Sequence, residues 1–150
     1  MSDKLTSKIS IAYVGANIDE YAKMFGIPEY GFIIKHMDSE SYDKKHPEQE
    51  GSYAVSFTDI INLNCHIDFN IGKIETIKEL DHTLRHEMLH CLVASLEGEA
   101  QRAVAIIKNE DFRKFMYETI RKEDERLVIR LTTLTDYFDF QKPYKVVKEK

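Results

Sequence analysis

The residues of this chain with the clearest capacity for chemistry lie in the run His86-Glu87-Met88-Leu89-His90. On a helix, side chains four residues apart lie on one face, so His86 and His90 can both bind one tetrahedral metal ion. Glu87 is about 100° round the helix from His86, close to such an ion without taking the same ligand position. The spacing predicts a zinc site in which Glu87 takes a proton from water and passes it to a leaving amine.

A catalytic zinc ion usually has three protein ligands, so one more ligand must come from outside this run. The longer pattern HExxHxxGxxH is absent, because Val93 and Leu96 occupy its glycine and last histidine positions. A carboxylate is therefore expected, and Glu99 is one option because a chain reversal near Gly98 would turn it back towards the motif. The full set of downstream candidates is Glu97, Glu99, Glu110, Asp111, Glu118, Glu123, Asp124 and Glu125.

Two other histidines, His46 and His82, are further candidates for the site. His82 lies one turn before His86, but three histidines on a straight helix span about 12 Å at ~1.5 Å per residue and cannot converge on one ion. His82 is therefore expected either at the entrance of the site, behind a ligand as its hydrogen-bond partner, or in solvent. His46 lies in the polar stretch 38–50 beside Pro47 and is expected to be exposed.

The segment before the motif has the clearest strand pattern in the chain. Between residues 61 and 71 the odd positions are apolar, and the even positions are Asn62, Asn64, His66, Asp68 and Asn70. Such alternation predicts a strand with one buried and one polar face. The polar face either contacts solvent or lines the site, in which case Asn62, Asn64 and His66 belong to the cleft. An edge strand here would bind an extended peptide.

The motif itself lies in a predicted helix. Thr76 and Glu79 have the spacing of a capping box, and an apolar stripe follows with a helical period through Leu84 and Met88. This helix is expected to end near Gly98. Further helices are expected over residues 99–108, from an Asn109 cap onwards, and over residues 123–138, with Pro143 as the final stop.

The first half of the chain predicts the sheet. Strands are expected at residues 9–14, 30–37 and 52–57, with a short helix at 17–25 that ends at Gly26 and a loop over 38–50. The fold class is thus α+β: a small N-terminal mixed or antiparallel sheet of three to four strands, followed by an active-site helix and C-terminal helices. Residues 1–144 form one domain and residues 145–150 a charged tail.

Composition excludes several classes of protein. Apolar residues make up 43% and charged residues 31% of 150 residues, which is typical of a globular domain. The net charge is −5 and basic residues do not cluster, which argues against nucleic-acid binding.

No apolar run approaches the ~20 residues of a membrane span, and residues 1–10 lack the apolar core of a signal peptide, so a cytoplasmic location is expected. Cys65 and Cys91 form no CxxC pair and are expected to be buried free thiols.

Two segments of the chain resemble one family. Residues 81–90, which include Thr83-Leu84-Arg85-His86-Glu87, resemble the TLxHExxH segment of small phage-encoded and prophage-encoded metallopeptidases, the minimal zincins. Residues 124–131, followed by Pro143, are similar to a downstream family segment of the form EExxVxxL. The resemblance covers roughly residues 58–143. It implies a minimal zincin fold, one zinc ion per chain, Glu125 as the third ligand and Asp124 as its acidic neighbour. Residues 96–122 form a longer connection than the family's usual short turn.

Three functions compete on this evidence. The first is a zinc metalloendopeptidase that hydrolyses a peptide or protein substrate with Glu87 as general base. The alternative is a non-catalytic zinc-binding protein of phage or prophage origin that acts by contact with a host or phage protein. The third is a metal-free structural protein, which one zinc ion per purified chain would exclude.

Overall fold

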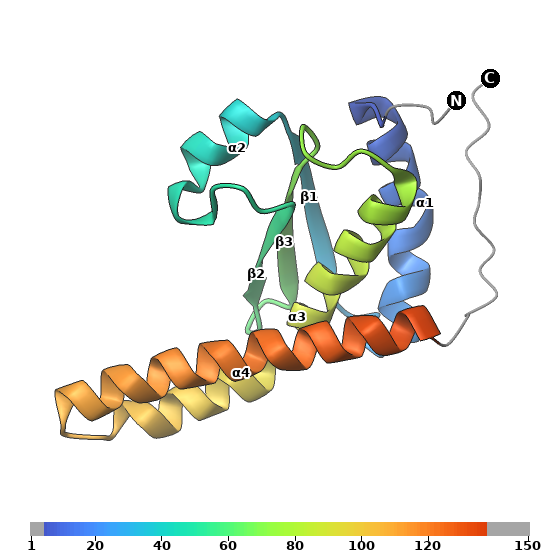
Figure 1. The fold of residues 1–150 in the computed structure, drawn as a ribbon. Coiled ribbons are helices and arrows are strands. Elements are labelled where there is room, and N and C mark those ends of the chain that lie inside the picture. Colours follow the sequence, from blue (N-terminus) through green and yellow to red (C-terminus); the bar gives the residue numbers. More distant parts are fainter. Residues whose placement is uncertain (1–4, 138–150) are drawn as a thin grey trace.

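The structure is a computed structural model that describes residues 5–137. Pro143 and the predicted tail at 145–150 lie outside the described residues. The expected α+β class is confirmed (Figure 1). In chain order the elements are α1 (Ser7–Met24), β1 (Gly31–Met37), α2 (Ser39–Lys45), a 3-10 turn (Pro47–Gln49), β2 (Ala54–Asp59), β3 (Asn64–Asn70), α3 (Ile77–Ala105) and α4 (Glu110–Tyr137).

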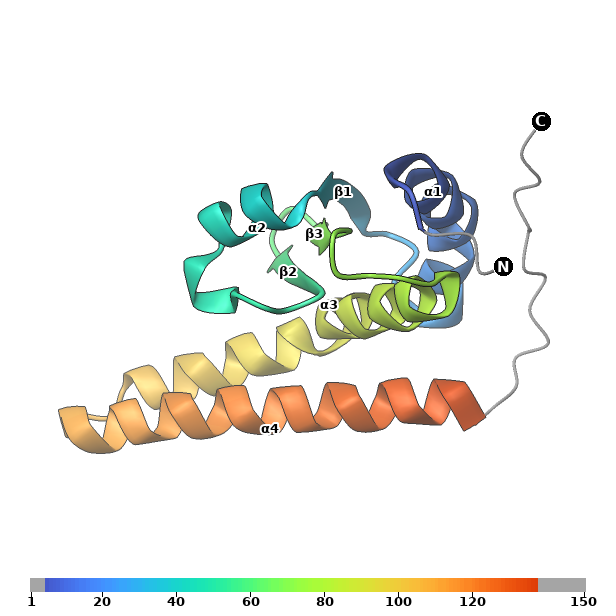
Figure 2. The same cartoon turned by 45° about the horizontal axis from the view of Figure 1, so that its top comes forward.

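The sheet has three strands in the order β1-β3-β2. β1 pairs with β3 in parallel and β2 pairs with it antiparallel, so the sheet is mixed and β3 is its central strand. Figure 2 shows α1 and α3 on one side of the sheet and α2 on the other. The odd residues of β3 are fully buried against the apolar stripe of α3, as the alternation predicted. This core includes Cys65, Ile67, Phe69, Leu80, Leu84 and Met88.

Two predictions for the first half of the chain are wrong. Residues 9–14 belong to α1 rather than to a strand, and the helix begins at a Thr6 cap whose side chain accepts a hydrogen bond from the Ile9 amide at 3.3 Å. Its buried residues Tyr13, Asn17 and Tyr21 recur every four positions, which is the helical period. Residues 38–50 are likewise not a simple loop, because Asp38 caps α2 and a 3-10 turn follows.

The polar face of β3 contacts α2. Asp68 is 2% exposed, and its Oδ2 lies 2.8 Å from His46 Nε2 and also binds the Lys45 ammonium group. Asn70 accepts a hydrogen bond from the Ser39 hydroxyl at 2.8 Å. The expectation that His46 is exposed is wrong, because the carboxylate of Asp68 faces α2 and the imidazole is buried against it.

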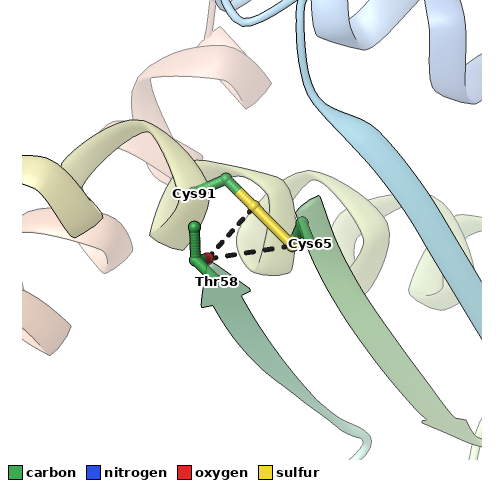
Figure 3. Close-up of a disulfide and its surroundings, with 3 residues drawn as sticks. All are labelled: Thr58, Cys65 and Cys91. Atoms are coloured by element: carbon green, nitrogen blue, oxygen red, sulfur yellow. Dashed lines mark hydrogen bonds between the residues drawn. A yellow bond between two sulfur atoms is a disulfide. The ribbon is translucent and has the colours of Figure 1, made fainter. Parts of the chain in front are cut away.

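A disulfide links the central strand to the helix that carries the motif. Cys65 of β3 and Cys91 of α3 are 0% and 1% exposed, which confirms the predicted burial. The two sulfur atoms are bonded, so the prediction of free thiols is wrong (Figure 3). The Thr58 hydroxyl of β2 donates to both sulfurs, at 3.3 Å to Cys91 and 3.9 Å to Cys65. This corner of the core therefore joins β2, β3 and α3.

The second half of the chain is a long helical hairpin (Figures 1 and 2). The capping box at Thr76 and Glu79 is confirmed, but α3 continues through Gly98 to Ala105, so the predicted end near Gly98 is wrong. α4 begins at the predicted Asn109 cap, whose side chain accepts from the Phe112 amide at 2.8 Å, and it is continuous through residue 122. Within residues 5–137, no helix combines the length and apolar character that crossing a membrane requires.

Candidate metal centre

The hairpin brings His86, His90 and Glu125 together. His86 Nε2 lies 3.4 Å from Glu125 Oε1, and His90 Nε2 lies 3.4 Å from Glu125 Oε2. One carboxylate on α4 thus faces both imidazoles of α3, and one donor atom from each of the three residues lies within 4.8 Å of the others. Glu99 does not join them: its side chain is 70% exposed and bonds to Arg102 at 2.7 Å.

The donor atoms of the three residues are close enough together to surround one metal ion. Zn²⁺ binds nitrogen and oxygen ligands at about 2.0–2.2 Å, which places neighbouring ligand atoms about 3.3–3.6 Å apart. Both nitrogen-to-oxygen distances of 3.4 Å fall in this range. Two imidazoles and one carboxylate are also a donor set that catalytic zinc sites use. The residues present therefore fit a zinc ion with one coordination position left for water.

Each histidine is oriented from behind through its other ring nitrogen. His90 Nδ1 lies 3.0 Å from Asp124 Oδ2, so Nδ1 carries the proton and Nε2 is left free to bind a metal. His86 Nδ1 lies 3.5 Å from the Thr132 hydroxyl. That hydroxyl donates to the Val128 carbonyl at 2.8 Å, so its oxygen is free to accept from His86. Asp124, named through the family resemblance, thus lies where a ligand's hydrogen-bond partner is needed.

Without a metal ion, the cluster attracts protons. Burial lowers the pKa of His90, but the hydrogen bond to Glu125 and the charges of Glu87 and Asp124 outweigh it and raise the pKa to about 9. Hydrogen bonds from His86 and His90 hold the pKa of Glu125 well below its usual range, even though burial opposes them. The site therefore favours positive charge between these groups, and a divalent cation would displace protons there.

Glu87 lies beside the cluster but deeper in the protein. It is 6% exposed, and burial raises the pKa of its carboxyl group against the opposing effects of a hydrogen bond with Ser56 and the charges of His86 and His90. Ser56 belongs to β2, so this strand contacts the motif directly. The sequence predicted the strand but no role for Ser56. The only available signal was the run of small side chains at alternate positions, Ala54, Ser56 and Thr58.

The cluster opens into a cavity of about 1090 Å³ between β2, α3 and α4. His82 lines it and bonds to Asp136 at 3.2 Å, which agrees with a place near the entrance. Asn62, Asn64 and His66 do not line the cavity, because the polar face of β3 is directed to α2 and not to the motif. Three cationic residues of α4, for which no sequence pattern indicated a role, also line it: Arg121, Lys122 and Arg126.

The strand next to the cavity is an edge strand. β2 pairs with β3 on one side only, and no segment among residues 5–137 pairs with its other side. The Asn70 amide donates to the Tyr53 carbonyl at 2.8 Å, and in an antiparallel ladder such bonds recur at every second residue. The main-chain groups of Ala54, Ser56 and Thr58 therefore point away from β3. The expectation of an edge strand at residues 61–70 is wrong, because β3 is central.

A buried ionic network fixes the two helices that carry the ligands. Asp81 accepts from the Tyr13 hydroxyl at 2.7 Å and from Tyr21, both on α1, and it pairs with Arg85 at 3.1 Å. Arg85 also bonds to Asp136 of α4 at 2.6 Å. Because Arg85 directly precedes His86, this network holds α3 and α4 in the register that places Glu125 opposite the histidines.

The chain matches no protein-family model, no curated protein and no solved structure.

Proposed function

We propose that this protein is a zinc-dependent endopeptidase of the minimal zincin type. The observation that supports this most is the convergence of two imidazole Nε2 atoms on the Glu125 carboxylate, 3.4 Å from each, with Glu87 buried beside them. A metal that is only structural needs no buried carboxylate next to its ligands and no cavity in front of them, since structural zinc sites are closed by four ligands.

Each residue of the site has a separate part in hydrolysis. His86, His90 and Glu125 would hold the zinc ion, which acts as a Lewis acid and makes water nucleophilic near neutral pH. Glu87 takes the proton of the attacking water and transfers it to the amine that leaves, which completes cleavage of the peptide bond.

The edge of β2 would bind the substrate. An extended peptide that pairs with Ala54, Ser56 and Thr58 adds a strand to the sheet and fixes its register through main-chain hydrogen bonds. Antiparallel pairing is slightly more stable per residue than parallel pairing, so the peptide is expected to run opposite to β2. Its scissile bond would then lie in the cavity beside the free edge of β2, near the Glu87 carboxylate.

The test compares the wild-type protein with Glu87→Gln and with Glu118→Gln, an exposed glutamate of α4 outside the cavity. Zinc content is measured by elemental analysis, and cleavage by mass spectrometry of a mixed peptide library. We expect one zinc ion per chain in all three proteins, with cleavage lost only in Glu87→Gln. A zinc-loaded wild type that cuts no peptide would overturn the proposal and favour the non-catalytic zinc-binding protein. Equal cleavage by Glu87→Gln would overturn the role of Glu87.

A further inference from the structure

The hairpin continues past the metal cluster and forms one wall of the cavity. α4 contributes Arg121, Lys122 and Arg126 to this wall, and α3 contributes Glu97 and Gln101. Arg126 is paired with Glu123, three residues before it on the same helix. Arg121 and Lys122 are exposed, and neither has an ion-pair partner within residues 5–137. Two cations thus border the cavity without a counter-charge of their own.

The acidic residues of the same cavity already have partners. Asp124 bonds to His90, and Glu125 bonds to both histidines of the motif. Glu97, on the facing helix, accepts a hydrogen bond from the Gln101 amide at 2.8 Å and forms no ion pair with either cation. Arg121 and Lys122 can thus pair with an anionic group, whereas Glu97 keeps its charge on the facing helix.

The position of the two cations relates them to the scissile bond. Arg121 and Lys122 precede Glu125 by four and three residues, which is about 4.5–6 Å along the helix axis. The two cations therefore lie about one helical turn from the third ligand, on the side that leads to the turn between α3 and α4.

The direction of β2 determines whether Arg121 and Lys122 lie on the N-terminal or the C-terminal side of the scissile bond. Ile60, just after the end of β2, lies against the hairpin, since its Cδ1 atom is 3.4 Å from the position of a Cβ atom built on Gly98. A peptide antiparallel to β2 begins at that end, so its N-terminal part lies beside the hairpin wall. We propose that Arg121 and Lys122 bind an acidic side chain of the substrate on the N-terminal side of the scissile bond. This inference rests on the proposed function.

The test measures binding, so it does not depend on turnover. The probe is a fluorescent peptide of alternating Val and Ala, in three forms: two Glu in the N-terminal half, two Gln at the same positions, or two Glu in the C-terminal half. Anisotropy titrations use zinc-loaded Glu87→Gln as the parent protein. We expect the first peptide to bind roughly threefold to tenfold more tightly than the second, which is the range for two partly exposed ion pairs.

Two variants assign the preference to residues. In Arg121→Gln/Lys122→Gln the preference for the first peptide should disappear, whereas in the matched control Arg113→Gln/Lys114→Gln, outside the cavity on the same helix, it should remain. The preference should also shrink with added salt, because the Debye length falls from about 30 Å at 0.01 M to about 3 Å at 1 M.

Equal binding of the Glu and Gln peptides would overturn the inference, as would a preference that survives in Arg121→Gln/Lys122→Gln. A preference for the peptide with Glu in its C-terminal half would overturn the assigned direction. If the wild type cleaves no peptide but the peptide with N-terminal Glu is still preferred, the proposed enzyme activity is overturned and the proposed acidic-residue site stands. If the wild type cleaves peptides but shows no preference for Glu, the proposed enzyme activity stands and the proposed acidic-residue site is overturned.

Discussion

Among residues 5–137, two clusters bring histidine and carboxylate together, apart from the exposed pair His82 and Asp136, and one of the two has the geometry of a candidate metal site. Between α3 and α4, His86 and His90 face Glu125 from the wall of a cavity, with side chains 21%, 22% and 50% exposed. Between α2 and β3, His46 faces Asp68, and these side chains are only 8% and 3% exposed. A short distance between histidine and carboxylate is common to both.

The two clusters differ in how many imidazoles face the carboxylate and in whether a lysine neutralises its charge. At Asp68, one imidazole and the Lys45 ammonium group share one carboxylate oxygen, so the charge of the carboxylate is already neutralised. Burial raises the pKa of Asp68, but the hydrogen bonds from Lys45 and His46 outweigh it and the pKa is lowered. At Glu125, two nitrogens point at one carboxylate, and their rings are oriented from behind by Asp124 and Thr132. What distinguishes the candidate metal site is therefore that three side chains converge and that each histidine has a second hydrogen-bond partner, and not merely a short distance between histidine and carboxylate.

The largest expected effect is on zinc binding when a ligand is removed. Glu125→Ala should weaken zinc binding by more than the roughly 10-fold to 100-fold that loss of a ligand's hydrogen-bond partner costs. Competition titration with a chelator measures this. Glu99→Ala is the matched control, because Glu99 is exposed and bonds to Arg102. If the control loses zinc as completely as Glu125→Ala does, the third ligand has been assigned to the wrong residue.

The next largest effect is expected for Asp124, which orients the ligand His90 but does not itself bind the metal. Asp124→Asn should weaken zinc binding by about 10-fold to 100-fold, because His90 Nδ1 loses a charged acceptor while Nε2 stays in place. Asp111→Asn, on an exposed part of α4, should leave zinc affinity unchanged. The same chelator titration tests both variants. An affinity for Asp124→Asn equal to that of the wild type would show that Asp124 does not orient the ligand.

The other cluster should affect stability and not zinc. Asp68→Asn should lower the free energy of unfolding by about 1–2 kcal/mol, since Lys45 and His46 lose their charged partner. Because the pKa of Asp68 is lowered in the fold, its stabilisation is complete above the unfolded value of about 3.9 and is lost as pH falls through the lower folded value. Urea unfolding near neutral pH and again in acid measures the difference, which should shrink in acid. Reduced zinc affinity in this variant would contradict the separation of the two clusters.

The smallest effect concerns Lys45, whose side chain is 42% exposed. A partly exposed ion pair contributes little, so Lys45→Gln should lower the free energy of unfolding by less than about 1 kcal/mol. Urea unfolding beside Asp68→Asn provides the measurement. A loss as large as that of Asp68→Asn would mean that Lys45, rather than His46, is the main partner of the carboxylate.

The local part of the site could be predicted because helix periodicity is a local property. His86, Glu87 and His90 needed only a helix, and the capping box at Thr76 and Glu79 indicated where it begins. The polar face of β3, however, contacts residues that are distant in the sequence. Asp68 binds Lys45 and His46, and only the tertiary fold determines that contact. The pairing of Cys65 with Cys91 likewise depends on how β3 packs on α3. Glu125 was indicated by a family resemblance and not by any spacing rule.

Errors in the helices have a common physical reason. A glycine inside a helix costs about 1 kcal/mol relative to alanine, and packing against a second helix outweighs this cost at Gly98. Val104, beyond Gly98, is 4% exposed, and α3 continues to Ala105, while α4 is unbroken across residues 121 and 122. The run at residues 9–14 was short and apolar, and such a run does not separate strand from helix. Tyr13, Asn17 and Tyr21 carried the deciding period but extend beyond that run.

The hairpin has a consequence for how this chain can vary in length. α3 and α4 run in opposite directions (Figure 1), and the turn that joins them follows His90 by 15 residues (105 − 90) and precedes Glu125 by 15 residues (125 − 110). Removing about seven residues from each helix, two turns of a paired hairpin, would keep the same faces in contact. Insertions and deletions in matched pairs would therefore change the reach of the hairpin while the three ligands keep their positions. The number of residues between the histidine ligands on α3 and Glu125 on α4 can then change during evolution without a change in the geometry of the site.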